Sequence, residues 1–307
     1  FTRFGNFQLP AARGEIELLR ALVDHSVRTD YPGLGAPGPE TYLAWLAEIA
    51  ARTGRLVAHW MRVGFVHGVM NTDNMSILNT TDAGEKRYRY GNQPQIAWWN
   101  LVQLANALHA LVPDVPALEA ALAAYPRSYE ADSQRMLAAK LGLATFRPEV
   151  DYELVDGLYR AMSLTETDFT LFHRRLAALC DDAPPAPETA LATLGEAWYA
   201  PAAVTDAIRA DVLAWVDAWR ARLLQEQRPA DERRARMNAV NPCYVLRNYL
   251  AQEAIDLAEA GDYSRVRETL AVLRQPYTEQ PGREHYAGKR PEWARQRAGC
   301  SMLSCSS

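Results

Sequence analysis

The sequence has few cysteines, no long apolar run and no excess of basic residues, and each absence excludes a class of protein. Its four cysteines are irregularly spaced, unlike those of a small secreted fold held by disulfides. No apolar run approaches the roughly 18 residues of a membrane-spanning helix. The net charge of −4 argues against a general nucleic-acid-binding protein. We therefore expect neither membrane nor nucleic-acid partners.

The chain has 307 residues, of which 49% are hydrophobic, enough for a sizeable core in one large or two ordinary domains. No repeat of fixed period occurs. Because the chain begins at Phe1 rather than Met, we expect it to be part of a longer protein, and it predicts nothing about a targeting peptide.

Most of the sequence has the pattern of Ala- and Leu-rich helices separated by Pro, Gly or Asp. Residues 1–15 differ, because they predict the end of an extended element followed by a turn. The longest predicted helix covers about residues 40–62, where apolar side chains recur every three or four positions. Other helices are predicted at 15–29, from 92 onward, and near 115–125, 128–142, 150–163, 167–179, 186–197, 204–226, 230–239, 243–260 and 263–274.

Three sites in the sequence predict where helices begin. Asn92 is a suitable N-cap for the helix that follows it, and Pro94 fits its first turn. The segments Thr165–Asp168 and Asn241–Pro242 also have the composition of helix starts.

Two other groups of side chains have predicted environments. The adjacent Trp98 and Trp99 are expected in the core rather than on a binding surface. The basic run Arg233, Arg234 and Arg236 is typical of a solvated helix face.

The segment Gly64–Leu78 has apolar ends and a polar middle, a common way to hold metal or phosphate ligands. His67 and Asn74 stand seven residues apart, the spacing of His and Asn in the kinase catalytic loop, where the Asn binds magnesium. The position of the usual kinase base is Val69, whereas a carboxylate, Asp73, directly precedes Asn74. This pattern indicates a kinase-type metal loop without the ordinary base.

The same polar cluster has an ordinary structural explanation. Asn and Asp side chains commonly form Asx turns, and a buried His is usually only hydrogen-bonded. The calcium-loop pattern does not fit, because Met75 and Ser76 stand where further ligands and a Gly are needed. The spacing alone leaves the metal loop and the plain turn both open.

Two features near the ends of the chain are also ambiguous from their residues. Arg3 stands among aromatic residues and suits either a surface position or an anion contact. Cys300 and Cys305 have no second Cys or His pair nearby and make a poor zinc site. A cysteine on a Ser-rich tail suits an exposed thiol.

Several motifs occur together in an order that resembles the selenoprotein O (YdiU-like) family. They are His67–Ser76, Asn92–Pro94, Trp99–Leu101, Lys140–Gly142, Met162–Ser163, Asn241–Pro242, Leu246–Gln252, Arg290–Ala294 and Cys305–Ser307.

The resemblance implies a mainly α chain that forms a protein-kinase-like C-lobe with additional C-terminal helices, the N-terminal lobe lying before Phe1. The implied domains are residues 1–14 as the end of the N-lobe or a hinge-like segment, 15–180 as the C-lobe with the catalytic hairpin at Gly64–Leu78, and 181–307 as a helical region with a Cys-containing tail.

The resemblance also implies a protein adenylyltransferase, which transfers AMP from ATP to Ser, Thr or Tyr hydroxyl groups and uses Mg²⁺ or Mn²⁺. By position, Asp73 matches the catalytic proton acceptor, Asn74 matches a metal ligand, and Arg3 matches a residue that contacts the ATP phosphates. Cys305 falls where some members carry selenocysteine, and the family's tail cysteine is implicated in redox control.

The expected partners are ATP and proteins with accessible hydroxyl side chains, with the protein itself a monomer. The expected location is the cytoplasm in a bacterium, or the mitochondrion in a eukaryote. Two alternatives are UMP transfer from UTP and a non-catalytic kinase-like helical scaffold. Val69 at the kinase-base position disfavours ordinary protein phosphorylation.

The chain departs from the family pattern after Leu78. The family has about twenty more residues before Asn79, in a loop of the activation type, and an Asp-Tyr-Gly there supplies the second metal ligand. Asp82 in Asp82–Gly84 imitates that ligand but aligns better beyond the missing segment. As written, the chain is expected to bind ATP poorly and to be inactive alone.

Overall fold

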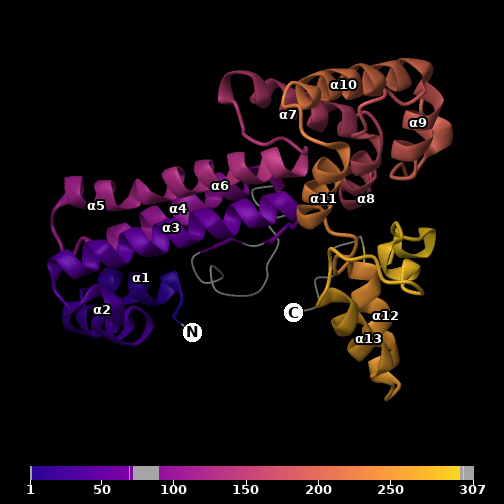
Figure 1. Ribbon diagram of the computed structural model, residues 1–307. Coiled ribbons are helices and arrows are strands. Elements are labelled where there is room, and N and C mark those ends of the chain that lie inside the picture. The colour runs from indigo at the N-terminus through magenta and orange to yellow at the C-terminus, as the bar shows by residue number, and fades with distance from the viewer. Residues whose placement is uncertain (1, 69, 72–89, 298–299, 301–307) are drawn as a thin grey trace. The chain divides into compact units, whose positions relative to one another are not determined.

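The computed structural model describes residues 2–68, 70–71, 90–297 and 300 (Figure 1). Within these ranges the chain is mainly helical, as predicted, and its only β-structure is an antiparallel bridge between Thr167 and Trp198. No described helix is both long and apolar enough to cross a membrane.

The chain divides into two compact units, Phe1–Gln134 and Arg135–Ser307, hereafter the first and second units. The division falls inside the helix α6 (Ala124–Lys140), and each unit has its own buried residues. The implied functional domains 1–14, 15–180 and 181–307 stay predictions.

The first unit is built around α3 (Pro39–Val63), which contacts both α4 and α5. The predicted helix at 40–62 is therefore confirmed, with Pro39 and Glu40 in its first turn. Its buried face consists mainly of Tyr42, Trp45, Leu46, Ala50, Thr53, Val57 and Ala58. The other elements are α1 (Phe4–Arg13), α2 (Ile16–Asp30), η1 (Pro32–Leu34), η2 (Tyr90–Asn92), α4 (Gln93–Leu108) and α5 (Val115–Leu122).

The prediction of an extended element at the start of the chain is wrong, because residues 4–13 form the helix α1. The Asn6 side chain accepts the Arg3 N–H at 2.7 Å, and Gly14 ends the helix in the left-handed region with φ of 70°. Phe7 is buried against the Trp45 ring, with 5.3 Å between centroids. Pro10 lies inside this helix and is buried, although proline usually disfavours a helix interior.

The helix predicted from Asn92 is confirmed as α4, with Pro94 in its first turn. The Asn92 side chain, however, makes no capping hydrogen bond. The predicted burial of Trp98 and Trp99 is wrong, because they are 36% and 41% exposed. Since α4 is apolar on more than one side, its sequence alone does not show which side faces the core.

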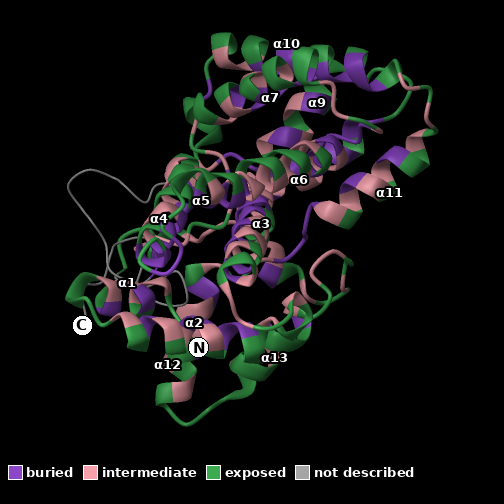
Figure 2. Cartoon of the chain, turned by 90° about the vertical axis from the view of Figure 1, so that its left-hand side faces the viewer, coloured by how far each residue is buried: buried purple, intermediate pink, exposed green. Residues whose placement is uncertain are grey.

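The second unit packs α7, α8, α9 and α10 around one apolar core, and buried and exposed residues both occur along α7 and α10 (Figure 2). Its helices are α7 (Pro148–Ser163), α8 (Phe169–Leu176), α9 (Pro187–Gly195), α10 (Asp206–Leu224), α11 (Ala230–Val240), α12 (Asn248–Glu259) and α13 (Ser264–Leu273). Its short 3-10 turns are η3 (Ala177–Leu179), η4 (Pro201–Ala203), η5 (Glu284–Ala287) and η6 (Glu292–Ala294).

One of the two predicted helix starts in this unit is confirmed. Asp168 caps α8 by accepting the Leu171 N–H at 3.0 Å. Asn241–Pro242 is not a helix start, because Asn241 ends α11 and α12 begins only at Asn248. The Asn241 side chain is instead buried and forms two hydrogen bonds with Lys140. Its Oδ1 accepts from Lys140 Nζ at 2.8 Å, and its Nδ2 donates to Lys140 O at 3.0 Å.

The prediction that the basic run in α11 is solvated is wrong for Arg233, which is 1% exposed. Its guanidinium forms an ion pair with Asp182, and Arg234 pairs with Asp181. A run of like charges does not reveal which member faces the core, because that depends on the acidic residues brought opposite it.

Candidate functional site

The hairpin segment begins where α3 stops at Gly64. Gly64 is in the left-handed region with φ of 72°, and the Phe65 N–H donates to Trp60 O at 3.0 Å, closing the last turn. The described residues 65–68 and 70–71 are not helical. A rigid helix therefore leads directly into the polar stretch that the sequence singled out.

Gln93, at the first position of α4, holds the first part of this segment. Its Nε2 donates to Phe65 O at 2.9 Å, and its Oε1 accepts the His67 N–H at 2.8 Å. Gln93 is fully buried, so these bonds satisfy both ends of an amide that water does not reach.

Asn100, two turns further along α4, holds the next part. Its Nδ2 donates to Met70 O at 2.7 Å and to Ile96 O at 2.9 Å. Both Asn100 and Met70 are fully buried. The backbone of Met70, three residues before Asp73, is thus fixed to the helix core.

His67 lies among aromatic rings rather than beside a carboxylate in the described structure. Its ring centroid is 5.2 Å from that of Trp60 and 6.3 Å from that of Phe65. Burial lowers the pKa of His67, so the ring is neutral at pH 7. Its buried Nδ1 has no hydrogen-bond partner among the described residues.

The catalytic and metal-binding predictions concern Asp73 and Asn74, which lie outside the described residues, as does Asp82. Within the described part, no group of three or more His, Cys, Asp or Glu side chains could hold a metal ion. The nearest candidate donor is Asn71 Oδ1, which is buried without a partner there. An amide oxygen suits Mg²⁺, but Asn71 alone is not a complete ligand set.

Arg3 lies at the N-terminal end of α1 with an exposed side chain. Helix α1 packs against α4, the helix that carries Gln93 and Asn100. Among the described residues, no hydrogen bond or ion pair joins Arg3 to residues 64–71. The predicted phosphate contact of Arg3 stays a prediction.

The predicted thiol of Cys305 also lies outside the described residues. Cys300 is 6% exposed, and burial raises the pKa of its thiol. Cys300 is therefore less reactive than an exposed thiol.

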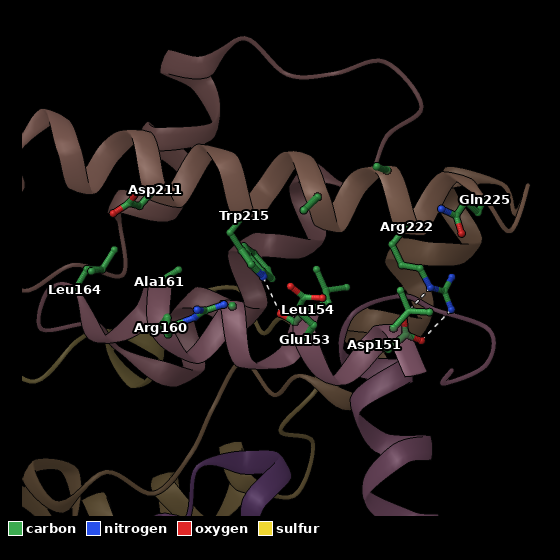
Figure 3. Close-up of a pocket in the computed structure, with 14 residues that line it drawn as sticks. Asp151, Glu153, Leu154, Arg160, Ala161, Leu164, Asp211, Trp215, Arg222 and Gln225 are labelled. Atoms are coloured by element: carbon green, nitrogen blue, oxygen red, sulfur yellow. Dashed lines mark hydrogen bonds and ion pairs between the residues drawn. The ribbon is translucent and has the colours of Figure 1, made fainter. Parts of the chain in front are cut away.

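A groove of about 720 Å³ between α7 and α10 offers different chemistry (Figure 3). At one end, Arg222 Nε lies 2.7 Å from Asp151 Oδ1, and Arg222 also pairs with Glu226 at 2.9 Å. Trp215 donates its Nε1–H to Leu154 O at 2.9 Å. Since Arg222 already binds two carboxylates, this end of the groove is not suited to nucleotide phosphates.

The sequence reasoning gave Gln93 and Asn100 no functional role. The available signal was weak, because Gln93 and Asn100 are two of five amide residues in α4, and only their spacing of seven positions places them on one face. Nothing local indicated that this face meets residues 65–70.

Comparison with known proteins connects this hairpin to a family. The family model described as protein adenylyltransferase SelO matches residues 1–84 and 79–274. Over its full length the chain is 49% identical to the protein nucleotidyltransferase YdiU of Aromatoleum aromaticum and 50% identical to that of Xanthomonas axonopodis pv. citri. It is 47% identical to the protein of the same name from Rhodopirellula baltica.

The chain spans 61% to 63% of the length of these relatives. The match nevertheless extends over the whole of this chain, through the hairpin and both compact units. The chain therefore belongs to the SelO (YdiU-like) family.

Proposed function

We propose that the protein of which this chain is part is a protein adenylyltransferase, which transfers AMP from ATP to Ser, Thr or Tyr hydroxyl groups. Its family membership supports nucleotidyl transfer, since the relatives are named protein nucleotidyltransferases. The main structural support is the anchoring of Phe65, His67 and Met70 to α4, since these residues closely precede the predicted site residues in the sequence.

In the proposed reaction, the acceptor hydroxyl oxygen attacks the α-phosphorus of ATP. The bond from that phosphorus to the bridging oxygen breaks, pyrophosphate leaves, and the Asp73 carboxylate receives the hydroxyl proton. Arg3 binds the phosphates, and Asn74 is one ligand of Mg²⁺ or Mn²⁺. The ion, when bound, neutralises phosphate charge.

A kinase-like fold is part of this proposal. It is supported by the long helix α3, which ends directly before a segment whose His67 and Asn74 have the kinase spacing, although Val69 stands where a kinase has its base. An ATP molecule lying reversed relative to that of a kinase turns its α-phosphorus toward the hydroxyl, which would let the base move from the Val69 position to Asp73.

The comparisons support an internal segment missing from this chain. The alignment with the Aromatoleum relative covers 330 residues, although the chain has 307, and the two family-model matches meet at residues 79–84. That is where the sequence predicted the lost Asp-Tyr-Gly. We propose that this segment supplies the second metal ligand, and that the present chain alone binds ATP weakly.

The test uses the full-length parent protein, ATP, Mg²⁺ and a mixture of candidate protein acceptors, with intact-mass spectrometry. The unaltered protein should add the mass of AMP to itself or to an acceptor. Asp73→Ala should lower this transfer by at least about a hundredfold while circular dichroism stays unchanged, because the proton acceptor is lost. Asp211→Ala removes an exposed carboxylate on α10 and should retain full activity.

Other outcomes identify other functions. Transfer by Asp73→Ala at the unaltered rate would remove Asp73 from the mechanism. Addition of UMP from UTP, with no addition from ATP, would establish the uridylyl alternative, and addition of phosphate would indicate a kinase. No addition with any nucleotide would favour the non-catalytic scaffold, which the missing segment also supports.

Three further predictions belong to the same proposal. The bacterial sources of the relatives support a cytoplasmic location. We also propose that the protein is a monomer and that its partners are proteins with accessible hydroxyl side chains.

A further inference from the structure

Helix α4 presents two amide side chains to the hairpin segment from a single face. Gln93 and Asn100 are seven residues apart, which is about 10.5 Å along a helix. Both are fully buried, in a helix whose other buried side chains are apolar: Ala97, Leu101, Leu104, Ala105, Ala107 and Leu108. Two amides at such positions need polar partners, and both find them in residues 65–70.

Gln93 binds the segment in the manner of a neighbouring strand. It donates to the carbonyl of Phe65 and accepts from the N–H of His67, two residues further on. A shift of the segment by one residue would break both bonds, because each joins the amide to one particular backbone atom. Gln93 thereby fixes the register of the segment.

Asn100 repeats half of this arrangement at Met70. Its Nδ2 donates to Met70 O, while its Oδ1 is buried and has no partner within the described ranges. Because Nδ2 already donates to two carbonyls, the amide orientation is determined, and Oδ1 is left as an acceptor for a donor outside those ranges or for water.

We infer that Gln93 and Asn100 are positioning residues, which fix the register of Phe65, His67 and Met70 in the segment that leads to the proposed catalytic residues. This inference rests on the proposed function for its catalytic consequence. Neither amide touches the reacting groups in the described structure. Their effect passes through the backbone, whose last anchored carbonyl is three residues before Asp73.

The test compares Asn100→Asp and Gln93→Glu in the full-length parent protein with two matched controls. Each variant replaces the donating NH₂ by an oxygen that faces a backbone carbonyl, with almost no change in volume. Asn106→Asp and Gln95→Glu make the same replacements at exposed positions of α4.

We expect the two buried variants to lower kcat for AMP transfer by about tenfold to a hundredfold, as misplacement of a catalytic group does, with KM for ATP within about threefold. Amides of residues 65–71 should exchange hydrogen faster in these variants, while those of α2 remain protected. The kcat deficit of Gln93→Glu should also shrink as pH falls, because the protonated carboxyl regains a donor. Both controls should match the unaltered protein.

The inference is overturned if both buried variants keep kcat within twofold of their controls, or if exchange at residues 65–71 is unchanged. Should Asn100→Asp not fold, Gln93→Glu decides alone, because it still accepts the His67 N–H. Should the unaltered protein transfer no nucleotide, the proposed function fails, whereas the exchange measurement still supports or contradicts the positioning role.

Discussion

His173, on α8, is 1% exposed and lies close to the ammonium group of Lys140. Its Nδ1 is 2.8 Å from Phe169 O, and Lys140 Nζ lies 5.0 Å from the centroid of the Phe169 ring. Burial and the charge of Lys140 together hold the pKa of His173 well below its usual range of about 6.5, although the bond to Phe169 acts the other way. The folded protein therefore keeps this ring neutral.

This neutral histidine predicts a loss of stability in acid. Below pH of about 6.5 the unfolded chain binds a proton at His173 that the folded chain does not, so the free energy of unfolding falls as pH decreases. The slope from one such group is at most about 1.4 kcal/mol per pH unit. His67 contributes in the same direction, because burial lowers its pKa as well. Urea unfolding at pH 7.5 and 5.0 measures the effect.

His173→Gln should make the free energy of unfolding depend less steeply on pH, because this titrating ring is removed. His109→Gln, at an exposed position just after α4, is the matched control. Equal slopes in the unaltered protein and His173→Gln would show that this ring is protonated in the folded state or does not titrate in this range.

At the scale of elements, α3 and the beginning of α6 pack with their backbones in close approach. A Cβ atom on Gly54 would lie 2.8 Å from Tyr125 O and 2.9 Å from Tyr129 N, both main-chain atoms. Nearby, the Ser128 hydroxyl donates to Ala51 O at 3.0 Å, joining the same two helices. The absence of a side chain at Gly54 is therefore what allows this packing.

Gly54→Ala should destabilise the protein by about 1–3 kcal/mol, even though Ala favours a helix over Gly by up to about 1 kcal/mol, because the added methyl group meets backbone atoms that cannot move alone. Denaturant unfolding measures this. Gly33→Ala is the control, since a Cβ there would meet no atom within 4 Å. A Gly54→Ala protein as stable as the control would show that the two helices can separate without cost.

The element boundaries were largely predictable, because Pro, Gly and Asp mark them locally. Asp168 shows this, since its capping role follows from residue type and position alone. The start of the chain was not predictable, because Pro10 and Gly14 look like a turn unless the burial of Phe7 against Trp45 is known. Likewise, the choice between the two sides of α4 depended on neighbours far away in the sequence.

At the scale of the whole molecule, the chain consists of two compact units with separate apolar clusters. Leu101 belongs to the cluster of the first unit, whereas Trp219 of α10 belongs to one in the second, and both are fully buried. Helix α6 runs through the division between the units. Local stability can therefore differ between the units.

Leu101→Ala should lower the stability of the first unit by about 2–5 kcal/mol, the usual cost of such a cavity. Hydrogen exchange followed by mass spectrometry should then show faster exchange in α3 and α4 but nearly unchanged exchange in α10. Phe172→Ala is the reciprocal control, with its effect in the second unit. Equal acceleration in α4 and α10 for either variant would mean that the whole chain unfolds as one.

The sequence by itself determined that this protein is mainly helical, where most of its helices lie, and to which family it belongs, because periodicity, capping residues and ordered motifs are local properties of the chain. Only the tertiary structure decided which charges are buried, as with Arg233 and Asp182, and which residues hold the hairpin. Gln93 and Asn100 meet backbone atoms between 26 and 30 residues away, and no local pattern encodes contacts at that separation.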